Sequence, residues 1–501
     1  MKCFLLLMVF GWSLTSIELI AQVYGSNSVE FQLGNLPYEG SREYSTSYDQ
    51  LNLHYDTQQI SLFAKFEQFY TPEHERNYFD LTQKRIQFQD DHFRVRVGNF
   101  YETLGRGLLL RSYDIPGSVY EDAYLRTRYA FFRDLEGVGV DYIHDRFEIK
   151  AVRAHTLYNP LPPNFEPDSL RRPDLVEAIQ ANFYATPKLN VGAIFMRYNS
   201  TSGEYQQFAS FISEYNLIEN IQLFGEYAFE TNSAFRFSEE EDSYAIYAGL
   251  NFYSGSWGGS FEVKNYQNML LGSGFNDPPS LIKEHTYPLL NRSTHVLETS
   301  GETGVQLESY YNFEGGHSLT ANFTRAINEG FIRFEYTEVF LEGLYEFSPQ
   351  FSLKSFLDYA NDDLKGEKNR ISVGTIVDKT MANGWNTILD VQYQQFKRAF
   401  EPGVSENLYT SIALAIFPAV TTALIFEAST DPQLTDNPTT FSTVETNTRT
   451  WLGGNISWKV NTANTLEIFG GKRRGGPACT SGICYEILDF EGLEVRFSTR
   501  F

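Results

Sequence analysis

The stretch that decides the fold is the C-terminal run Leu493-Glu494-Val495-Arg496-Phe497-Ser498-Thr499-Arg500-Phe501. Positions 493, 495, 497, 499 and 501 carry mainly apolar and aromatic side chains, and the positions between them carry charged or polar ones. Successive side chains of a β-strand point to opposite faces, so this pattern predicts a strand with one apolar and one polar face.

The same alternation recurs along almost the whole chain. It is clear over residues 60–67, 221–230 and 385–394, in runs of about ten residues. A run of about ten residues is also the length that a tilted strand needs to cross a bilayer. The repeated pattern therefore predicts an all-β protein built from strands of membrane-spanning length.

Short and long connections alternate between these runs. The predicted short connections are Asp56-Thr57, His144-Asp145, Thr186-Pro187, 217–220, Ser254-Gly255, 314–316, Ser348-Pro349, Phe417-Pro418 and Asn461-Thr462. The predicted long connections are 70–79, 102–134, 158–173, 231–240, 268–299, 397–404, 431–445 and 472–486. Short periplasmic turns and long extracellular loops are typical of a transmembrane antiparallel up-and-down β-barrel, here of about 24 strands (roughly 22–26).

One run departs from the regular pattern. In residues 332–347 the apolar phase shifts near Glu338, which predicts either a bulge or an additional turn.

Composition and charge agree with a barrel and exclude some functions. Of 501 residues, 16% are aromatic, while the mean hydropathy is only −0.33. A net charge of −23 argues against nucleic-acid binding, which requires clustered Lys and Arg. A large soluble secreted β protein would have a similar composition and stays open as a weaker alternative.

The N-terminus has the features of a signal peptide. Lys2 is followed by a short apolar segment, and Ala21 stands at a plausible cleavage point, so we expect residues 1–21 to be removed and residues 22–501 to form one barrel domain. Fewer than ten residues then precede the first strand, which leaves no room for an N-terminal plug domain. Export also favours a disulfide between Cys479 and Cys484.

Two stretches resemble an uncharacterised family of outer-membrane β-barrels from Bacteroidota. They are residues 98–113 (GNFYETLGRGLLLRSY) and residues 470–501, which begin GGKRRGG and contain both cysteines. The resemblance implies a barrel in the outer membrane of a Gram-negative bacterium, and it implies no activity or functional residues. The terminal Phe501 further resembles the signal that the outer-membrane assembly machinery reads, although an interfacial aromatic residue would look the same.

The chain shows no recognisable chemistry. Phosphate-binding loops, zinc-protease motifs and nucleophile elbows are absent at the spacings that those activities require, so we predict no enzyme, no catalytic residue, no cofactor and no metal. Only His285 and His295 are close together, in the longest predicted loops, where histidines usually bind nothing.

Residues 102–134 stand out because they are rich in Leu, aromatic residues and Arg in an otherwise acidic chain. One interpretation is a segment folded into the lumen, with its arginines paired to carboxylates of the inner wall. The other is two additional wall strands, for example 105–113 and 124–133. The arginines are Arg106, Arg111, Arg126, Arg128 and Arg133, and the candidate partners are Glu226, Glu230, Glu262, Glu308 and Glu494.

Two functions from different classes fit this fold. The first is a pore or transport protein, whose wide lumen must be filled by loops or by a partner protein, since an open pore of this size would leak. Its wall carries both signs of charge, including Arg94, Arg96, Glu226 and Glu262, so strong charge selectivity is not expected. The second is a non-conducting structural or assembly barrel that anchors an envelope partner. The expected partners are outer-membrane lipid, the assembly machinery and such an envelope protein.

Overall fold

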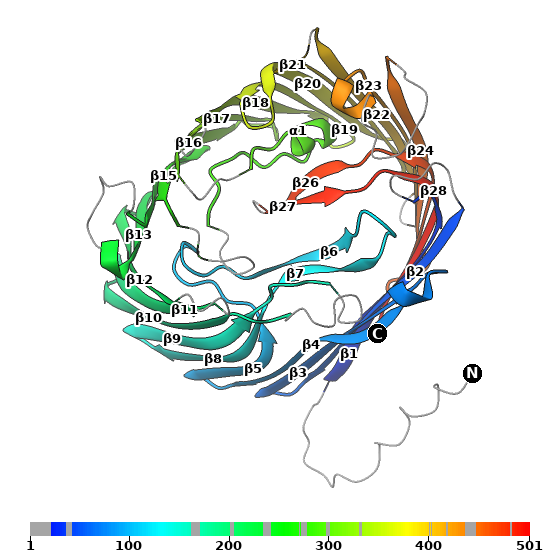
Figure 1. Ribbon diagram of the computed structural model, residues 1–501. Coiled ribbons are helices and arrows are strands. Elements are labelled where there is room, and N and C mark those ends of the chain that lie inside the picture. Colours follow the sequence, from blue (N-terminus) through cyan, green and yellow to red (C-terminus); the bar gives the residue numbers. More distant parts are fainter. Residues whose placement is uncertain are drawn as a thin grey trace.

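A computed structural model describes residues 22–36, 43–161, 171–200, 205–233, 242–269, 271, 278–296, 301–329, 333–399, 401, 403–416, 419–435, 447–480 and 483–501. Twenty-four antiparallel strands form one closed sheet (Figure 1). Each strand pairs with the next along the wall, and β1 pairs with β28 to close the ring, from Ser26 opposite Arg500 to Gly34 opposite Gly492. The predicted barrel of about 24 strands is confirmed.

The wall strands are β1 (Gln22–Gly34), β2 (Tyr44–Asp56), β3 (Ile60–Tyr70), β4 (Tyr78–Gln89), β5 (Phe93–Phe100), β8 (Leu135–His144), β9 (Phe147–Thr156), β10 (Leu175–Thr186), β11 (Leu189–Asn199), β12 (Tyr205–Ile218), β13 (Ile221–Glu230), β14 (Tyr244–Ser254), β15 (Trp257–Gln267), β16 (Gly301–Asn312), β17 (Ser318–Asn328), β18 (Phe334–Ser348), β19 (Phe351–Asp362), β20 (Glu367–Thr380), β21 (Trp385–Arg398), β22 (Ser405–Ile416), β23 (Val420–Ser429), β24 (Arg449–Lys459), β25 (Asn464–Arg473) and β28 (Phe490–Arg500).

The remaining elements are not part of the barrel wall. They are β6 (Tyr113–Glu121), β7 (Arg128–Arg133), β26 (Gly476–Thr480), β27 (Ile483–Ile487), the helices α1 (Pro288–Arg292) and α2 (Pro432–Thr435), and two short 3-10 turns, η1 (His74–Arg76) and η2 (Thr231–Ser233). Among the described residues, no helix has the length and apolar character needed to cross a bilayer.

The two faces of the wall differ as the alternation predicts. Large apolar side chains such as Phe211, Leu424 and Leu452 are exposed on the outer face, whereas polar residues such as Glu226 and Glu338 are buried on the inner face. An apolar exterior with every wall strand paired on both sides satisfies the backbone in lipid. The protein is therefore a transmembrane β-barrel of the outer-membrane type.

Of the run 332–347, residue 332 lies outside the described residues, and residues 333–347 contain no additional turn. From Phe334 to Ser348 they form the single strand β18, and its pairing with β19 shifts only between Glu346 and Ser348. The phase change near Glu338 does not interrupt the ladder, in which Glu338 lies opposite Ala360. The irregularity lies at the end of the strand, beside the short connection to β19.

Three long connections turn back into the barrel (Figure 1). We call residues 101–134 the first lumen segment, residues 278–296 the second lumen segment, and residues 474–480 with 483–489 the third lumen segment. The first contains the β6–β7 hairpin, the second contains α1, and the third contains the β26–β27 hairpin. Because β5 pairs directly with β8, and β25 with β28, neither hairpin belongs to the wall.

Candidate functional site

The first lumen segment is attached to the wall by apolar contact. Leu104, Leu108, Leu109 and Leu110 are fully buried within one apolar cluster. The cluster includes inward-facing wall residues from β9 to β15, namely Val152, Ala154, Val176, Ala178, Ile194, Met196, Phe208, Ile212, Ala228, Ala245 and Tyr266. Full burial of each leucine contributes about 1.5–3 kcal/mol. This part of the lumen is thus filled with side chains, as a protein core is.

Gly105 and Arg106 fix the register of this contact. The Gly105 amide donates to Gln180 Oε1 at 2.9 Å, and the Arg106 amide donates to Glu226 Oε2 at 2.5 Å. Gly105 adopts a left-handed conformation, with φ +56°, and a Cβ atom there would lie 2.6 Å from Glu226 Oε2. Only glycine allows the backbone to approach the wall carboxylate this closely.

The arginines of the first lumen segment meet two of the predicted carboxylates and three others. Arg106 pairs with Glu214 at 2.5 Å, in addition to the contact of its amide with Glu226. Arg128 pairs with Glu30 and, at 2.7 Å, with Glu121 of its own hairpin, while Glu494 lies 3.9 Å away. Two of the five predicted acids, Glu226 and Glu494, therefore lie beside this segment.

The other three predicted acids are placed elsewhere. Glu262 accepts a hydrogen bond from Tyr247, and Glu308 pairs with Lys283 at 2.6 Å. Within the described part of the chain, Glu230 forms no ion pair with the five arginines. The sequence did not indicate the partners Glu30, Glu121 and Glu214. In a chain with many carboxylates, the sequence does not show which of them lies opposite a given arginine across the lumen.

Arg126 holds the end of the hairpin, and the two remaining arginines have local contacts. Arg126 is 2% exposed and donates to the Asn35 carbonyl at 2.6 Å and to Glu121 at 3.0 Å. Burial raises the pKa of the Glu121 carboxyl, and the nearby Arg126 opposes this shift. The Arg133 guanidinium lies over the Phe131 ring, while Arg111 forms an isolated bridge with Thr103.

The two predicted wall arginines of β5 also face the lumen. Arg94 pairs with Asp141 at 2.6 Å, and Arg96 pairs with Asp141 at 2.9 Å and with Glu102 at 2.6 Å. Since Glu102 belongs to the first lumen segment, Arg96 ties the start of that segment to the wall.

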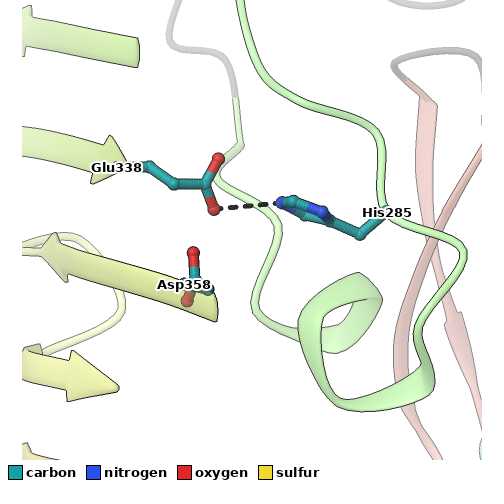
Figure 2. A group of neighbouring side chains, drawn as sticks. All are labelled: His285, Glu338 and Asp358. Atoms are coloured by element: carbon teal, nitrogen blue, oxygen red, sulfur yellow. Dashed lines mark hydrogen bonds and ion pairs between the residues drawn. The ribbon is translucent and has the colours of Figure 1, made fainter. Parts of the chain in front are cut away.

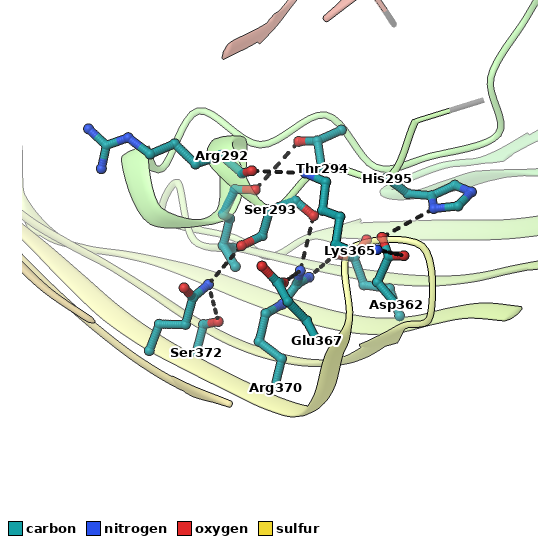
Figure 3. Close-up of polar contacts among 12 residues, drawn as sticks. Arg292, Ser293, Thr294, His295, Asp362, Lys365, Glu367, Arg370 and Ser372 are labelled. Atoms are coloured by element: carbon teal, nitrogen blue, oxygen red, sulfur yellow. Dashed lines mark hydrogen bonds and ion pairs between the residues drawn. The ribbon is translucent and has the colours of Figure 1, made fainter. Parts of the chain in front are cut away.

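Charged contacts attach the second lumen segment. Lys283 reaches Glu308, the Tyr287 hydroxyl donates to Glu342 at 2.6 Å, and Arg292 forms two hydrogen bonds with Glu427 at 2.6 and 3.0 Å. Figure 3 shows how Arg370 of β20 reaches up to this segment, where it donates to the Ser293 carbonyl at 3.0 Å. Each of these contacts joins the segment to a different wall strand.

His295 of the second lumen segment is a titratable residue that contacts two wall carboxylates (Figure 3). Its Nδ1 lies 3.2 Å from Asp362 Oδ2, its Nε2 lies 3.5 Å from Glu302 Oε2, and its ring stacks on Tyr336 at 4.4 Å. Burial disfavours the imidazolium, but the hydrogen bonds to Asp362 and Glu302 outweigh it and raise the pKa of His295. Through its two nitrogens the His295 ring bridges β16 and β19.

His285, ten residues earlier, lies in a second buried polar group. Its Nε2 is 3.1 Å from Glu338 Oε1 on β18, and Asp358 of β19 lies beside Glu338 (Figure 2). His285 and His295, which the sequence placed together in one loop, thus contact separate sets of wall carboxylates.

The third lumen segment connects the other two. Cys479 and Cys484 form a disulfide, and the Asn291 side chain exchanges hydrogen bonds with the backbone of Cys479 at 2.7 and 3.0 Å. On the other side, Ile483 joins Ile115 and Phe131 in an apolar cluster. Contacts therefore run without a break from β21 and β22, through α1, β26, β27, β6 and β7, to β3 on the other side of the barrel (Figure 1).

Among the described residues, two cavities lined in part by charged side chains lie beside this partition. One of about 590 Å³ lies between the first lumen segment and strands β1–β4, β25 and β28. Another of about 350 Å³ lies between α1 and strands β22, β23, β24, β25 and β28. Both are lined by Glu467 and Arg496, whose ion pair measures 3.8 Å. Because each lining mixes acidic and basic side chains, neither cavity favours one sign of charge.

The first and last wall strands, β1 and β28, close the ring. Phe501 is exposed, and its backbone exchanges hydrogen bonds with that of Gly25 at 2.8 and 3.1 Å. The predicted signal peptide, residues 1–21, lies outside the described residues.

Fold and site together define an outer-membrane β-barrel whose lumen is crossed by its own segments. A family model described as a family of unknown function (DUF6029) matches residues 188–335, from the turn before β11 to the start of β18. No curated protein sequence matches the chain.

Several solved barrels are similar in structure. Pseudomonas aeruginosa OccK5 (OpdH) is 11% identical with a TM-score of 0.39, covering 75% of this chain and 97% of its own. The P pilus usher (PapC) translocation pore is 8% identical with a TM-score of 0.46, and the match covers 96% of this chain and 99% of the usher chain. The siderophore receptor PirA from Pseudomonas aeruginosa is 11% identical with a TM-score of 0.49, covering 96% and 80%. Identities and TM-scores this low transfer no function.

Proposed function

We propose that this protein is a transport barrel of the outer membrane, closed at rest by its three lumen segments and opened by release of the second one. The observation that carries the proposal is the unbroken line of contacts across the lumen, with a polar cavity left beside it. A barrel of 24 strands is too wide for its wall side chains alone to fill. A closing device is therefore needed, and the described segments supply one.

The second lumen segment is the part that can move. It is held by separable charged contacts such as those of Arg292 and His295, whereas the leucines of the first lumen segment are packed as a core is. Small changes of protonation or charge can release the former without unpacking the latter.

Planar-bilayer recording tests this function. Wild-type protein is expected to stay closed for most of the time and to show brief openings. Replacing residues 281–295 by a short Gly/Ser bridge should leave the wall assembled, because closure of a surface loop costs little extra with length, and should raise the mean conductance several-fold. Replacing 106–130 in the same way should open the other half of the lumen. Substituting the exposed turn His74–Arg76 is the matched control and should change nothing.

A permanently closed barrel that anchors an envelope partner is the second candidate. The buried leucines that hold the first lumen segment favour it, since nothing in that contact responds to conditions. It predicts that wild-type protein never conducts although the 281–295 variant does. If the variant assembles and still does not conduct, the closing role of the second lumen segment is excluded.

Three further properties stay proposals. Recognition of Phe501 by the assembly machinery predicts that Phe501→Asp lowers the assembled yield in cells while protein refolded in detergent is normal; equal yields in cells would contradict it. Origin in Bacteroidota rests only on the resemblance of residues 98–113 and 470–501. No enzymatic activity is proposed.

A further inference from the structure

Three potential metal ligands from separate elements meet beside the second lumen segment. His285 lies in that segment, Glu338 on β18 and Asp358 on β19, and one ligand atom from each lies within 4.8 Å of the other two. All three side chains are at most 1% exposed. Figure 2 shows the two carboxylates one above the other, with the His285 ring facing Glu338.

Each of these side chains has a buried polar atom without a hydrogen-bond partner. The Arg370 guanidinium donates to one oxygen of each carboxylate, Glu338 Oε1 at 3.1 Å and Asp358 Oδ2 at 3.2 Å. The other oxygens, Glu338 Oε2 and Asp358 Oδ1, and His285 Nδ1 have no partner. A buried carboxylate oxygen left unpaired is costly, and two such oxygens beside an imidazole nitrogen form a set of ligands that a cation can satisfy.

The charges of this group also call for a cation. Arg370 faces three carboxylates, since Glu367 lies 3.1 Å from it in addition to Glu338 and Asp358. Arg398 lies farther from Glu367, at 3.8 Å, and is paired with Asp431. One guanidinium therefore cannot balance the ionised carboxylates of Glu338, Asp358 and Glu367 together. A divalent cation between Glu338 and Asp358 would supply the missing positive charge.

We propose that His285, Glu338 and Asp358 bind a divalent first-row transition-metal ion that fastens the second lumen segment to the wall. An imidazole nitrogen with two carboxylate oxygens suits Zn²⁺ and its neighbours better than Ca²⁺ or Mg²⁺, which prefer oxygen ligands alone. Arg370 holds the remaining carboxylate oxygens and so orients both ligands. The inference concerns metal binding and does not depend on whether the barrel conducts.

His295 provides an internal comparison. It is buried in the same segment and also contacts two carboxylates, but Asp362 lies at its Nδ1 and Glu302 at its Nε2. The two acids are on opposite sides of the ring, so no single ion can bind both together with the ring. In addition, Lys264 already pairs with Glu302. The geometry therefore assigns a metal to His285 and none to His295.

The test uses full-length protein purified in detergent. Metal content is measured by inductively coupled plasma mass spectrometry before and after chelation, and Zn²⁺ is then titrated by calorimetry, with Co²⁺ absorption to report the ligands. His285→Gln lies in the segment and spares the wall, Asp358→Asn removes a wall ligand, and His295→Gln is the matched control. Electrophoretic mobility of the folded barrel checks that each variant is assembled.

We expect one equivalent of metal per wild-type chain, loss of this equivalent in His285→Gln, and full retention in His295→Gln. A Co²⁺ spectrum that changes in His285→Gln would identify the nitrogen ligand even if Asp358→Asn failed to fold. The proposal is overturned if folded wild-type protein neither contains nor takes up stoichiometric metal. It is equally overturned if His285→Gln binds as the wild type does, or if His295→Gln loses the metal as well.

Discussion

The first and second lumen segments fill the same barrel by different physical means. Leu104 and Leu108–Leu110 bury apolar area against an apolar part of the inner wall, whereas Arg292, His285 and His295 reach buried carboxylates. Apolar burial depends little on pH, while an ion pair is lost when either partner changes its charge. The difference indicates one fixed segment and one that can be released.

The largest effect is expected from a charge in the apolar contact. Leu109→Asp would bury a carboxylate among aliphatic side chains, which costs several kcal/mol, so the first lumen segment should leave the wall while the 24-strand ladder stays intact. Conductance and proteolysis of residues 101–134 should both increase. Tyr124→Asp, at the exposed end of the hairpin, is the control and should behave as wild type. Unchanged proteolysis of Leu109→Asp would show that the leucines do not hold the segment.

The next effect concerns the ionic side of the comparison. Arg292→Met leaves Glu427, whose side chain is 5% exposed, without its bidentate partner. Breaking a buried pair in this way costs about 3–5 kcal/mol, so the second lumen segment should loosen while the first does not. Limited proteolysis distinguishes the two segments. Arg333→Met removes an exposed pair with Glu335 and should have almost no effect. Equal loosening of both segments would mean that they form a single unit.

A smaller effect is expected from pH. The pKa of His295 is raised, so its contribution is fully present below the ordinary histidine pKa and is lost as pH rises through the raised value. Lys283 and Arg292 keep their contacts with Glu308 and Glu427, so only part of the attachment of the second lumen segment is lost. Openings of wild-type protein should become more frequent at alkaline pH. His295→Gln should abolish this pH dependence; a variant that keeps it would assign the titration to another group.

The smallest effect is expected from the disulfide. Replacing Cys479 and Cys484 with Ser frees a very short loop, which costs about 2 kcal/mol within the β26–β27 hairpin alone. The barrel should assemble normally and stay closed, because Asn291 contacts the backbone of residue 479 and not its sulfur. Hydrogen exchange should rise only in the third lumen segment. Loss of the assembled barrel would show that this hairpin is needed for folding.

The sequence predicted the wall far better than the lumen. Alternation such as that of Leu493–Phe501 is imposed locally by lipid on one side and water on the other, so it can be read from one strand at a time. The leucines of residues 104–110 likewise predicted that this segment is shielded from water. The partners of this segment could not be read, because contacts such as Arg106 with Glu214 join residues far apart in the chain.

The group around His285 shows the same limit. Glu338 and Asp358 look like ordinary inward-facing strand carboxylates, and only the return of the second lumen segment into the barrel brings His285 to them. The prediction of no metal site rested on spacing in sequence, which is uninformative when the ligands come from three elements. Histidines in long loops of a barrel therefore need to be judged by where the loop folds.

Hydrogen–deuterium exchange of the intact barrel, measured peptide by peptide at neutral and alkaline pH and corrected for the intrinsic pH dependence of exchange, tests the central claim most directly. The account predicts that residues 104–110 are protected as strongly as the wall strands at both pH values. It predicts weaker protection of residues 281–295, decreasing further at alkaline pH. Equal and pH-independent protection of the two stretches would contradict the division into one fixed and one releasable segment.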